Sequence, residues 1–337
     1  MTRHLLPNTA RYFKANLHAH STLSDGKFSP QEVKAFYKAK GYHILSITDH
    51  NLVVDHSDMN EADFLLLTGA EYNINEAGLP ANYSRTCHLN CIAKRPELLW
   101  QPFANPAYRD EQLPYLEKAE VETLLREYTP EAINAIIARA NEKGHLVMYN
   151  HPVWSLETYP DYMPLEGLWG MELYNYSSMV CGYHDYDNAA VYRDLMRRGG
   201  NLYPLGADDS HSQKDLGGAW IMVGAEKLEY ASVIDALEKG DFYASMGPEI
   251  HSLTLDGSIL TIRCSDAKMV TLESGIRFGR CATPVHNDGL LREASFDIQP
   301  WLDVCRGDGR DWLRLVVHGP YGQLAATRGY RAEELRG

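Results

Sequence analysis

Residues 11–26 read RYFKANLHAHSTLSDG, and this stretch places two histidines and an acid directly after an extended segment. Alternate residues of a strand point to the same side, so His18 and His20 can reach one point. Asp25 lies on the Ser-Asp-Gly loop that follows, close enough in sequence to join them. One H-x-H motif is weak evidence, because a buried histidine is more often a structural residue than a ligand. The later strands decide between these two interpretations.

Similar side chains stand at or near the ends of the strands expected further along the chain. They are His50 after residues 42–48, Glu71 at the end of 63–72, His88 within 86–93, His151 after 145–150, and Asp209 and His211 after 201–206. In α/β folds the carboxyl ends of parallel strands share one face, where functional sites are built. We therefore expect these residues to converge with His18, His20 and Asp25 on a multinuclear metal centre.

Strand-like and helix-like segments alternate over the first two-thirds of the chain, which predicts an α/β fold with parallel pairing, as a barrel or a doubly wound sheet. Helices are expected at residues 30–40, opened by the capping box Ser29-Pro30-Gln31-Glu32, and at 115–127, 130–143, 187–198 and 231–239. From about residue 247 the segments become short and β-rich, with an Asp256-Gly257 hairpin signal. We expect an α/β domain over residues 1–247 and an all-β domain over 248–337.

Composition and charge exclude several classes of function. The 337 residues include 32 Lys and Arg against 45 Asp and Glu, a formal charge of −13, and no basic run, so a nucleic-acid polymer is not an expected partner. No apolar run reaches the length of a membrane span, and the N-terminus lacks a secretory stretch, so we expect a cytoplasmic protein without membrane contact. Six cysteines without a C-x-x-C pair argue against a disulfide framework or a thiolate zinc site, whereas fourteen histidines stand out.

The order H-x-H, D-G, T-D-H-N, G-A-E, a lone His, N-H-P and D-x-H resembles the PHP (polymerase and histidinol phosphatase) superfamily of metal-dependent hydrolases. The resemblance covers about residues 10–247 and implies a distorted seven-stranded β/α (TIM-like) barrel that holds two or three metal ions. It implies nine ligands, with Glu71 bridging two ions: His18, His20, Asp25, His50, Glu71, His88, His151, Asp209 and His211. The β-rich continuation, entered through residues 243–251 (YASMGPEIH), resembles the carbaryl hydrolase-like branch, which implies a small β-sandwich-like domain over 248–337.

This donor set has chemical consequences. Imidazoles and carboxylates without a thiolate suit Zn²⁺, Mn²⁺ or Fe²⁺. Three such ions against three carboxylates leave the site at about +3, which favours a small anionic substrate. We therefore expect a phosphoesterase that hydrolyses a small phosphate monoester, a nucleotide or sugar phosphate, with a metal-bound hydroxide. The alternatives are a hydrolase of a carbamate, ester or amide, and a non-catalytic scaffold. The sequence leaves the oligomeric state open.

Further residues are candidates for secondary roles. Asp49 is expected either to protonate the leaving group or to orient the imidazole of His50, and Glu172 and Asp208 are weaker candidates of the same type. Candidate substrate contacts are the basic residues Lys27 and Arg85 and the pairs Tyr72-Asn73, Tyr149-Asn150 and Tyr174-Asn175. The segment 94–130 is expected to cap the site. The remaining histidines are expected to be dispensable for metal binding: His4, His43, His56, His145, His184, His251, His286 and His318.

Overall fold

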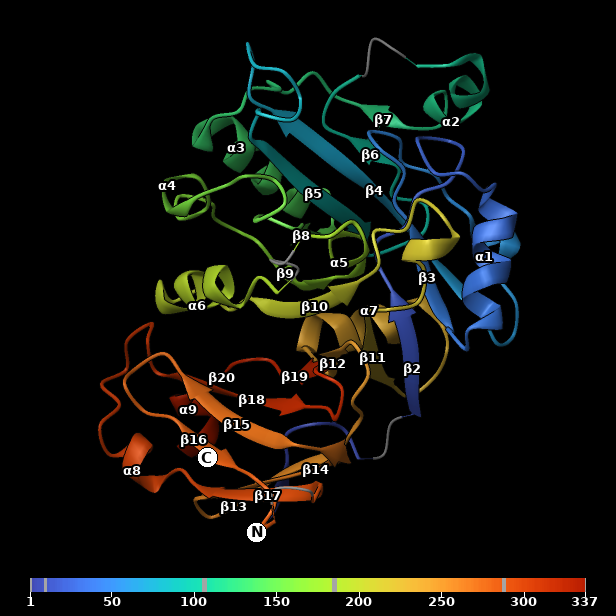
Figure 1. Cartoon of the computed structure of the whole chain (residues 1–337). Coiled ribbons are helices and arrows are strands. Elements are labelled where there is room, and N and C mark those ends of the chain that lie inside the picture. The colour runs from blue at the N-terminus through green and yellow to red at the C-terminus, as the bar shows by residue number, and fades with distance from the viewer. Residues whose placement is uncertain (1, 9–10, 105–107, 184–186, 287–288, 337) are drawn as a thin grey trace.

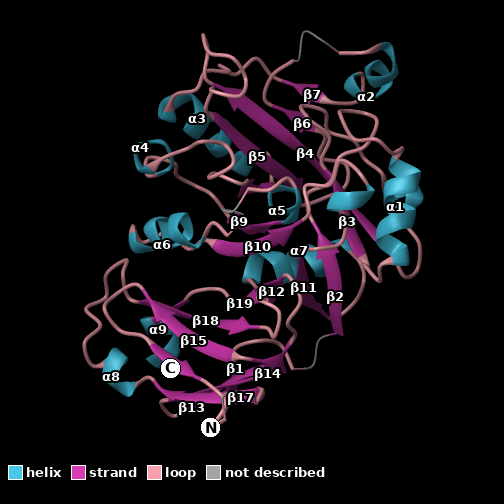
Figure 2. Ribbon diagram, viewed as in Figure 1, coloured by secondary structure: helices cyan, strands magenta, loops and turns pink. Residues whose placement is uncertain are grey.

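The computed structural model describes residues 2–8, 11–104, 108–183, 187–286 and 289–336. These residues form a mixed α/β protein with one large sheet, a separate four-stranded antiparallel sheet, and a two-stranded pair of β6 (Trp100–Gln101) and β7 (Glu120–Val121) (Figures 1 and 2). The α/β part that begins at residue 11 occupies one end of the molecule, and the β-rich C-terminal part occupies the other, together with the N-terminal residues 3–4 (Figure 1).

In the large sheet, the strands of the α/β part follow the order β10-β9-β8-β5-β4-β3-β2-β11-β12. Its strands are β2 (Arg11–Asn16), β3 (Ile44–Ile47), β4 (Leu65–Asn75), β5 (Thr86–Ala93), β8 (His145–Tyr149), β9 (Gly170–Asn175), β10 (Tyr203–Ala207), β11 (Trp220–Ala225) and β12 (Phe242–Ser245). Strands β2, β3 and β4 pair in parallel, as do β8, β9 and β10. An isolated parallel bridge between Ala19 and Ser210 joins the segments that follow β2 and β10. The carboxyl ends of these two strands are therefore neighbours.

Strand β5 departs from the expected parallel pairing, because it runs antiparallel to both β4 and β8. Only residues 76–85 connect β4 to β5, and a parallel crossover needs a dozen or more residues, usually including a helix. The reversed direction explains why His88 stands near the start of its strand. It pairs with Asn73, two residues beyond Glu71, so it reaches the face where β4 delivers Glu71.

Several helices lie in the connections between strands of the large sheet, and the last two lie in the C-terminal part (Figure 2). The helices are α1 (Pro30–Ala39), α2 (Leu113–Leu116), α3 (Pro130–Glu142), α4 (Tyr159–Tyr162), α5 (Tyr176–Val180), α6 (Ala189–Arg197), α7 (Tyr230–Lys239), α8 (Gln299–Leu302) and α9 (Ala332–Arg336), with 3₁₀ turns η1 (Ser57–Met59), η2 (Asp110–Gln112) and η3 (Gln213–Asp215). The predicted capping box of α1 is confirmed: the side chain of Ser29 accepts from the N–H of Glu32, whose carboxylate accepts from the N–H of Ser29. In α3, the side chains of Ile133, Ile136 and Ile137 are buried, and each such burial contributes about 1.5–3 kcal/mol.

The helix predicted at residues 115–127 is wrong over most of its length. Helix α2 ends at Leu116, and the chain then forms β7, which pairs with β6. The backbone N–H groups of Glu122 and Leu124 donate to the carbonyls of Gln101 and Pro102. Because these hydrogen bonds join residues far apart in sequence, local helix propensity could not reveal them.

The C-terminal part contains two packed sheets. The separate sheet holds β1 (Arg3–His4), β13 (Ile250–Asp256), β14 (Ile259–Ala267) and β17 (Leu291–Asp297). The strands β15 (Met269–Ser274), β16 (Arg280–Ala282), β18 (Trp312–His318), β19 (Leu324–Ala326) and β20 (Tyr330–Arg331) continue the large sheet, because β19 pairs with β12. Leu253 and Leu260 of one sheet share a hydrophobic core with Leu272 and Leu315 of the other. The expected β-rich region is confirmed, while the domain boundary at residue 247 stays a prediction.

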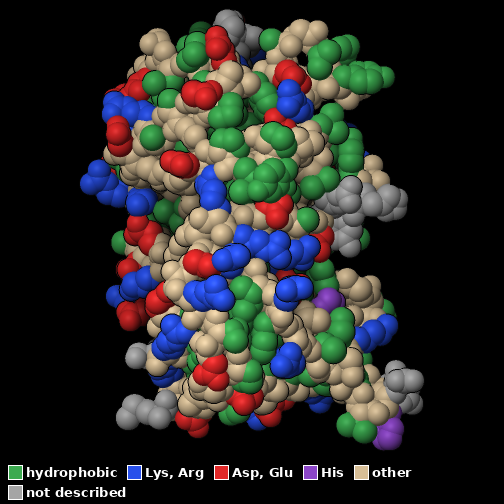
Figure 3. Space-filling view, turned by 90° about the vertical axis from the view of Figure 1, so that its left-hand side faces the viewer, with side chains coloured by type: hydrophobic (Ala, Val, Ile, Leu, Met, Phe, Trp, Pro, Cys, Tyr) green, Lys and Arg blue, Asp and Glu red, His purple; other side chains and the backbone are tan. Residues whose placement is uncertain are grey.

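The predicted Asp256-Gly257 hairpin joins β13 to β14, with Gly257 in the left-handed region that such a turn needs (φ 59°). On one face of the molecule, acidic and basic side chains are interspersed, and Lys and Arg gather across its middle (Figure 3). No helix among the described residues is both long and apolar enough to cross a bilayer.

Candidate metal centre

All nine residues with predicted ligand roles gather at the carboxyl end of the parallel strands. Their imidazole nitrogens and carboxylate oxygens form overlapping groups in which the atoms lie within 4.8 Å of one another. The groups are His20, Asp25, His50 and His211; His18, His20, Glu71 and Asp209; His50, Glu71 and His88; and His18, His151 and Glu172. The convergence that the sequence predicts is therefore present, with Glu172 as an additional member.

Glu71 occupies the centre of this cluster and is only 1% exposed. Its Oε1 lies 3.2 Å from His18 Nε2, 3.0 Å from His88 Nδ1 and 3.4 Å from His151 Nε2, and its Oε2 lies 3.4 Å from His20 Nε2 and 3.1 Å from His50 Nδ1. The side chain of Asn150 also donates to Oε1, at 2.7 Å. One carboxylate thus faces five imidazoles, with both of its oxygens shared.

The other two carboxylates among the predicted ligands, Asp209 and Asp25, differ in exposure. Asp209 Oδ1 lies 3.2 Å from His18 Nε2 and 3.1 Å from His20 Nε2, in the buried part. Asp25 is 55% exposed, and its carboxylate lies 3.4 Å from His211 Nε2 and 3.7 Å from His50 Nε2. The cluster therefore includes buried donors and one carboxylate that is largely exposed.

The donor set fits divalent metal ions. The buried Nδ1 of His50 has no hydrogen-bond partner, although Glu71 Oε2 lies 3.1 Å away. A carboxylate offers about four lone-pair sites, so five neutral imidazoles cannot all donate to Glu71. Cations held between the nitrogens and oxygens would satisfy lone pairs that otherwise face one another. Without a thiolate among the donors, this chemistry suits Zn²⁺, Mn²⁺ or Fe²⁺.

Backbone strain is concentrated at the same place. Four described residues other than glycine have a positive φ: Asn51 (55°), His151 (26°), Leu156 (61°) and Asp209 (53°). Two of them belong to the cluster, and Asn51 follows His50 directly. Such conformations persist only where the surrounding structure holds them, and they collect at functional sites.

In three of the histidines, one ring nitrogen contacts a neighbouring oxygen, so that the second ring nitrogen faces the cluster. His18 Nδ1 lies 2.7 Å from Glu172 Oε1, and His151 Nδ1 lies 3.1 Å from Ser155 Oγ. His211 Nδ1 donates to the backbone carbonyl of Asp209, at 2.9 Å. Contacts of this kind fix the tautomer and the ring orientation of metal-binding histidines.

Glu172, one of the weaker candidates from the sequence, contacts two of the candidate ligands in the structure. It is fully buried, and its Oε2 accepts from the backbone N–H of His151 at 2.9 Å and from Asn175 Nδ2 at 3.0 Å. Together with its contact to His18, this one carboxylate positions two of the candidate ligands.

Burial and neighbouring charge set the protonation states of the cluster. Burial lowers the pKa of His50 to about 3, so its imidazole stays neutral, as a metal ligand requires. Burial opposes the protonation of His211, but its contact with Asp25 and the charge of Asp209 raise the pKa to about 9. Burial likewise opposes the ionisation of Glu71, but the surrounding imidazoles, His18 foremost, hold the pKa of its carboxyl well below the usual range.

Asp49 and Asp208, also candidates for proton transfer or imidazole orientation, form hydrogen bonds that hold loops. Asp49 accepts from the backbone N–H and the hydroxyl of Ser21, at 2.8 and 2.7 Å, and from the hydroxyl of Ser24, at 2.7 Å. This arrangement corrects the expectation for Asp49, because its oxygens are directed to the serines and not to His50. It fixes the loop between His20 and Asp25.

Asp208 performs the same task for the loop that follows β10. Its carboxylate accepts from the backbone N–H groups of Gly217, Gly218 and Ala219 and from the hydroxyl of Tyr37. Burial raises the pKa of Asp208 to about 6. The loop held in this way includes residues 209–211, which carry two of the candidate ligands.

A cavity of about 380 Å³ opens above the cluster. Its lining residues are Asp25, Lys27, His50, Glu71, His88, His151, Trp154, Ser177, Ser178, Cys181, Asp209, His211, Ser212, Lys214 and Asp215. Lys27 is thus placed at the cavity, as expected from the sequence. Lys214 and Trp154 were missed, although each stands three residues after a candidate ligand, and that spacing is the signal that could have found them.

The remaining candidate substrate contacts do not line this cavity, although Asn73 lines a neighbouring one. Arg85 forms ion pairs with Glu76 and Asp161, at 2.5 and 2.7 Å. The three tyrosines lie in the hydrophobic core: Tyr72, Tyr149 and Tyr174. Successive residues of a strand point to opposite sides, so the asparagines of the same pairs turn the other way.

These asparagines support the site. Asn150 donates to Glu71 and Asn175 to Glu172, while Asn73 is bonded to Asn51 and Arg126.

The segment 94–130 packs against loops that carry candidate ligands. The hydroxyl of Tyr108 donates to the carbonyl of Asn51, and Arg109 and Gln112 donate to carbonyls of residues 22–24. Its role as a cap stays a prediction. Seven of the histidines expected to be dispensable are outside the four groups of donors, and the eighth, His184, is outside the described residues.

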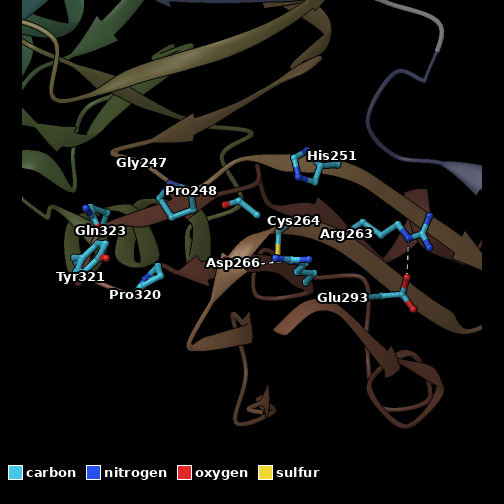
Figure 4. A pocket seen from close by; sticks show the side chains of 13 residues that line it. Gly247, Pro248, His251, Arg263, Cys264, Asp266, Glu293, Pro320, Tyr321 and Gln323 are labelled. Carbon is cyan, nitrogen blue, oxygen red and sulfur yellow. Dashed lines mark hydrogen bonds and ion pairs between the residues drawn. The ribbon is translucent and has the colours of Figure 1, made fainter. Parts of the chain in front are cut away.

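A larger cavity, of about 860 Å³, lies in the C-terminal part, between β13, β14, β17 and the turn around Tyr321 (Figure 4). Its charged side chains include the ion pairs Arg263–Glu293 and Arg292–Asp266, at 2.7 and 2.5 Å. Because these charges neutralise one another, the smaller cavity over the histidine cluster is the better candidate for catalysis.

Comparison with known proteins adds a few distant similarities. No family model matches the chain. Over 69 residues it is 36% identical to a 5′-3′ exoribonuclease of Haemophilus influenzae, a match that covers 19% of this chain and 25% of that enzyme.

Among solved structures, a two-domain protein containing a predicted PHP-like metal-dependent phosphoesterase, from Bacteroides vulgatus, matches over 97% of this chain and 98% of its own, with 16% identity and a TM-score of 0.45. An amidohydrolase from Chromobacterium violaceum matches over 59% of this chain and 88% of its own, with 17% identity and a TM-score of 0.36.

Proposed function

We propose that this protein is a metal-dependent phosphoesterase that hydrolyses a small phosphate monoester, such as a nucleotide or a sugar phosphate. The observation that carries the proposal is the buried Glu71 carboxylate, which faces five imidazoles at 3.0–3.4 Å beside one cavity. Asp25 and Asp209 add further carboxylate oxygens to this set of donors.

The nine candidate ligands provide donors for two or three divalent ions, with Glu71 between them. Bound ions would supply Lewis acidity and lower the pKa of a water molecule towards neutrality. The chain's own contribution is orientation, because Glu172 holds His18 and His151 while Asp208 holds the loop of Asp209. We also infer that the strands close into the distorted seven-stranded barrel expected from the sequence, which the Ala19–Ser210 bridge supports.

The surroundings of the donors favour an anionic substrate over a neutral acyl compound. Lys27 and Lys214 line the same cavity as the candidate ligands. A volume of about 380 Å³ is suitable for a small molecule. The name of the Haemophilus influenzae enzyme denotes cleavage of phosphoester bonds, which agrees with this chemistry, while the charge of −13 favours a small substrate over a polymer.

The test is a phosphate-release screen on protein stripped of metal and reloaded with Mn²⁺, Zn²⁺ or Fe²⁺. We expect release from at least one nucleotide or sugar phosphate, its loss in His20→Ala, and its retention in His251→Ala, which lies outside the donor groups. Aryl carbamates and nitrophenyl esters belong in the same panel. Absence of phosphate release from every substrate, with metal bound, would overturn the proposal, and turnover of a carbamate or ester in its place would identify the other kind of hydrolase.

A further inference from the structure

A second cavity adjoins the one above the histidine cluster. It has a volume of about 510 Å³ and shares His50, His88 and Trp154 with the first cavity. The two volumes therefore meet at the candidate metal ligands, with the Trp154 side chain at the junction. A substrate whose phosphate reaches the cluster can extend into this space.

The two cavities differ in the charged groups that line them. The first cavity is lined by Lys27 and Lys214 together with the candidate metal ligands and Asp215. The described lining of the second consists of amides, hydroxyls, apolar groups and one acid, besides the three shared residues: Asn51, Asn73, Asn75, Glu76, Leu79, Ala81, Ser84 and Thr86. That acid, Glu76, is neutralised by its ion pair with Arg85. The second cavity is thus suited to an uncharged group that forms hydrogen bonds.

Asn75 is the best placed of these amides. It is exposed, and its Oδ1 accepts from the hydroxyl of Thr86 at 2.6 Å, which fixes the plane of the amide. The side-chain NH₂ group can then donate to a ligand in the cavity.

Trp154 supplies an aromatic wall at the junction. It is 38% exposed, and its ring meets the rings of His151 and His88 edge-on, at centroid distances of 4.9 and 5.8 Å. The loop that carries it is fixed, because the carbonyl of Ser155 accepts from the N–H of Thr86 at 3.2 Å. A held, part-exposed indole next to polar amides can bind a flat ring that carries hydrogen-bonding groups.

We propose that the second cavity binds the leaving group of the phosphate monoester, and that it selects one with a flat, uncharged ring stacked on Trp154, as in a nucleoside. This inference rests on the proposed phosphoesterase activity. Water adds its oxygen to phosphorus, the bond from phosphorus to the ester oxygen breaks, and that oxygen takes up a proton and leaves as the alcohol. Trp154 and Asn75 position the departing alcohol and take no part in the proton transfer.

The test compares a nucleoside 5′-monophosphate with ribose 5-phosphate, in which a hydroxyl group replaces the base, on the metal-loaded protein. The readout is the ratio of their kcat/KM values. We expect the wild type to favour the nucleotide and Trp154→Ala to lower the ratio roughly 5- to 100-fold, the range of one stacked base. Trp154→Phe should retain most of the wild-type preference for the nucleotide, and Asn75→Leu should lower the ratio roughly 2- to 10-fold.

Tyr321→Ala removes an 88% exposed aromatic side chain of the C-terminal part and serves as the matched control, with an unchanged ratio. Release of phosphate from both substrates, with a ratio that Trp154→Ala leaves unaltered, would overturn the assignment of the second cavity while the phosphoesterase activity stands. Release from no phosphate ester at all would overturn the activity and, with it, this inference.

Discussion

Replacing Glu172 by glutamine should lower the affinity for metal although this residue lies at the back of the candidate ligands. Three donors surround its carboxylate: the Nδ1 of His18 at 2.7 Å, the backbone N–H of His151 at 2.9 Å and the amide of Asn175 at 3.0 Å. Glutamine keeps the shape but replaces one accepting oxygen with an NH₂ group, so at least one of these contacts becomes donor against donor.

The amide has two orientations, and both weaken the site. If its NH₂ group faces His18, the imidazole moves its proton to Nε2 and loses the lone pair that faces Glu71. If its NH₂ group faces His151, the backbone N–H of His151 loses its acceptor, and the position of this ligand is no longer held. A hydrogen bond to a charged group contributes about 1.5–3 kcal/mol, which corresponds to a loss of metal affinity of roughly 10- to 100-fold.

The assay is a titration of metal-free protein with Zn²⁺ or Mn²⁺ against a competing chelator, with circular dichroism to verify folding. Glu157→Gln is the matched control, because Glu157 is a similarly buried acid whose carboxylate accepts from Tyr149 and Tyr128. A folded Glu172→Gln protein with the metal affinity of the wild type would refute the role assigned to Glu172.

Three further outcomes follow from single residues. His20→Ala and Asp209→Ala should each lower the affinity for metal at least tenfold, so that bound metal and phosphate release fall together. Elemental analysis that shows full metal occupancy in either variant would contradict this expectation. Burial raises the pKa of Glu157 to about 8, so the folded protein retains a proton that the unfolded chain releases above its ordinary pKa of 4.5. The free energy of unfolding should therefore fall by about 1.4 kcal/mol per unit as pH rises from 5 to 8, a slope that Glu157→Gln removes in urea unfolding, and identical slopes would refute it. A Cβ added at Gly26 would lie 2.5 Å from the backbone oxygen of His20, so Gly26→Ala should displace Asp25 and lower metal occupancy, and unchanged occupancy would count against this geometry.

Most of the candidate metal centre could be predicted because its donors are placed by local rules. Alternation along a strand puts His18 and His20 on one side, and the shared direction of parallel strands brings His151 and Asp209 to the same end. The capping box at Ser29 likewise needs only neighbouring residues, and it was predicted correctly.

Contacts over long sequence distances escaped prediction. His18 and Glu172 are 154 residues apart, and no local pattern indicates that their side chains meet. The Tyr-Asn pairs show the same limit, since each pair was expected to contribute both residues to a substrate, whereas Tyr149 enters the core and Asn150 contacts Glu71.

The types of donor, their order along the chain and the β-rich character of the C-terminal part could be predicted from the sequence, because residue identity and short-range periodicity carry that information. Three features became evident only in the folded chain: the antiparallel direction of β5, the pairing of β19 that joins the C-terminal strands to the large sheet, and the position of Trp154 where two cavities meet. These features depend on pairing and packing between segments distant in sequence, whose free energy arises only when the whole chain has folded.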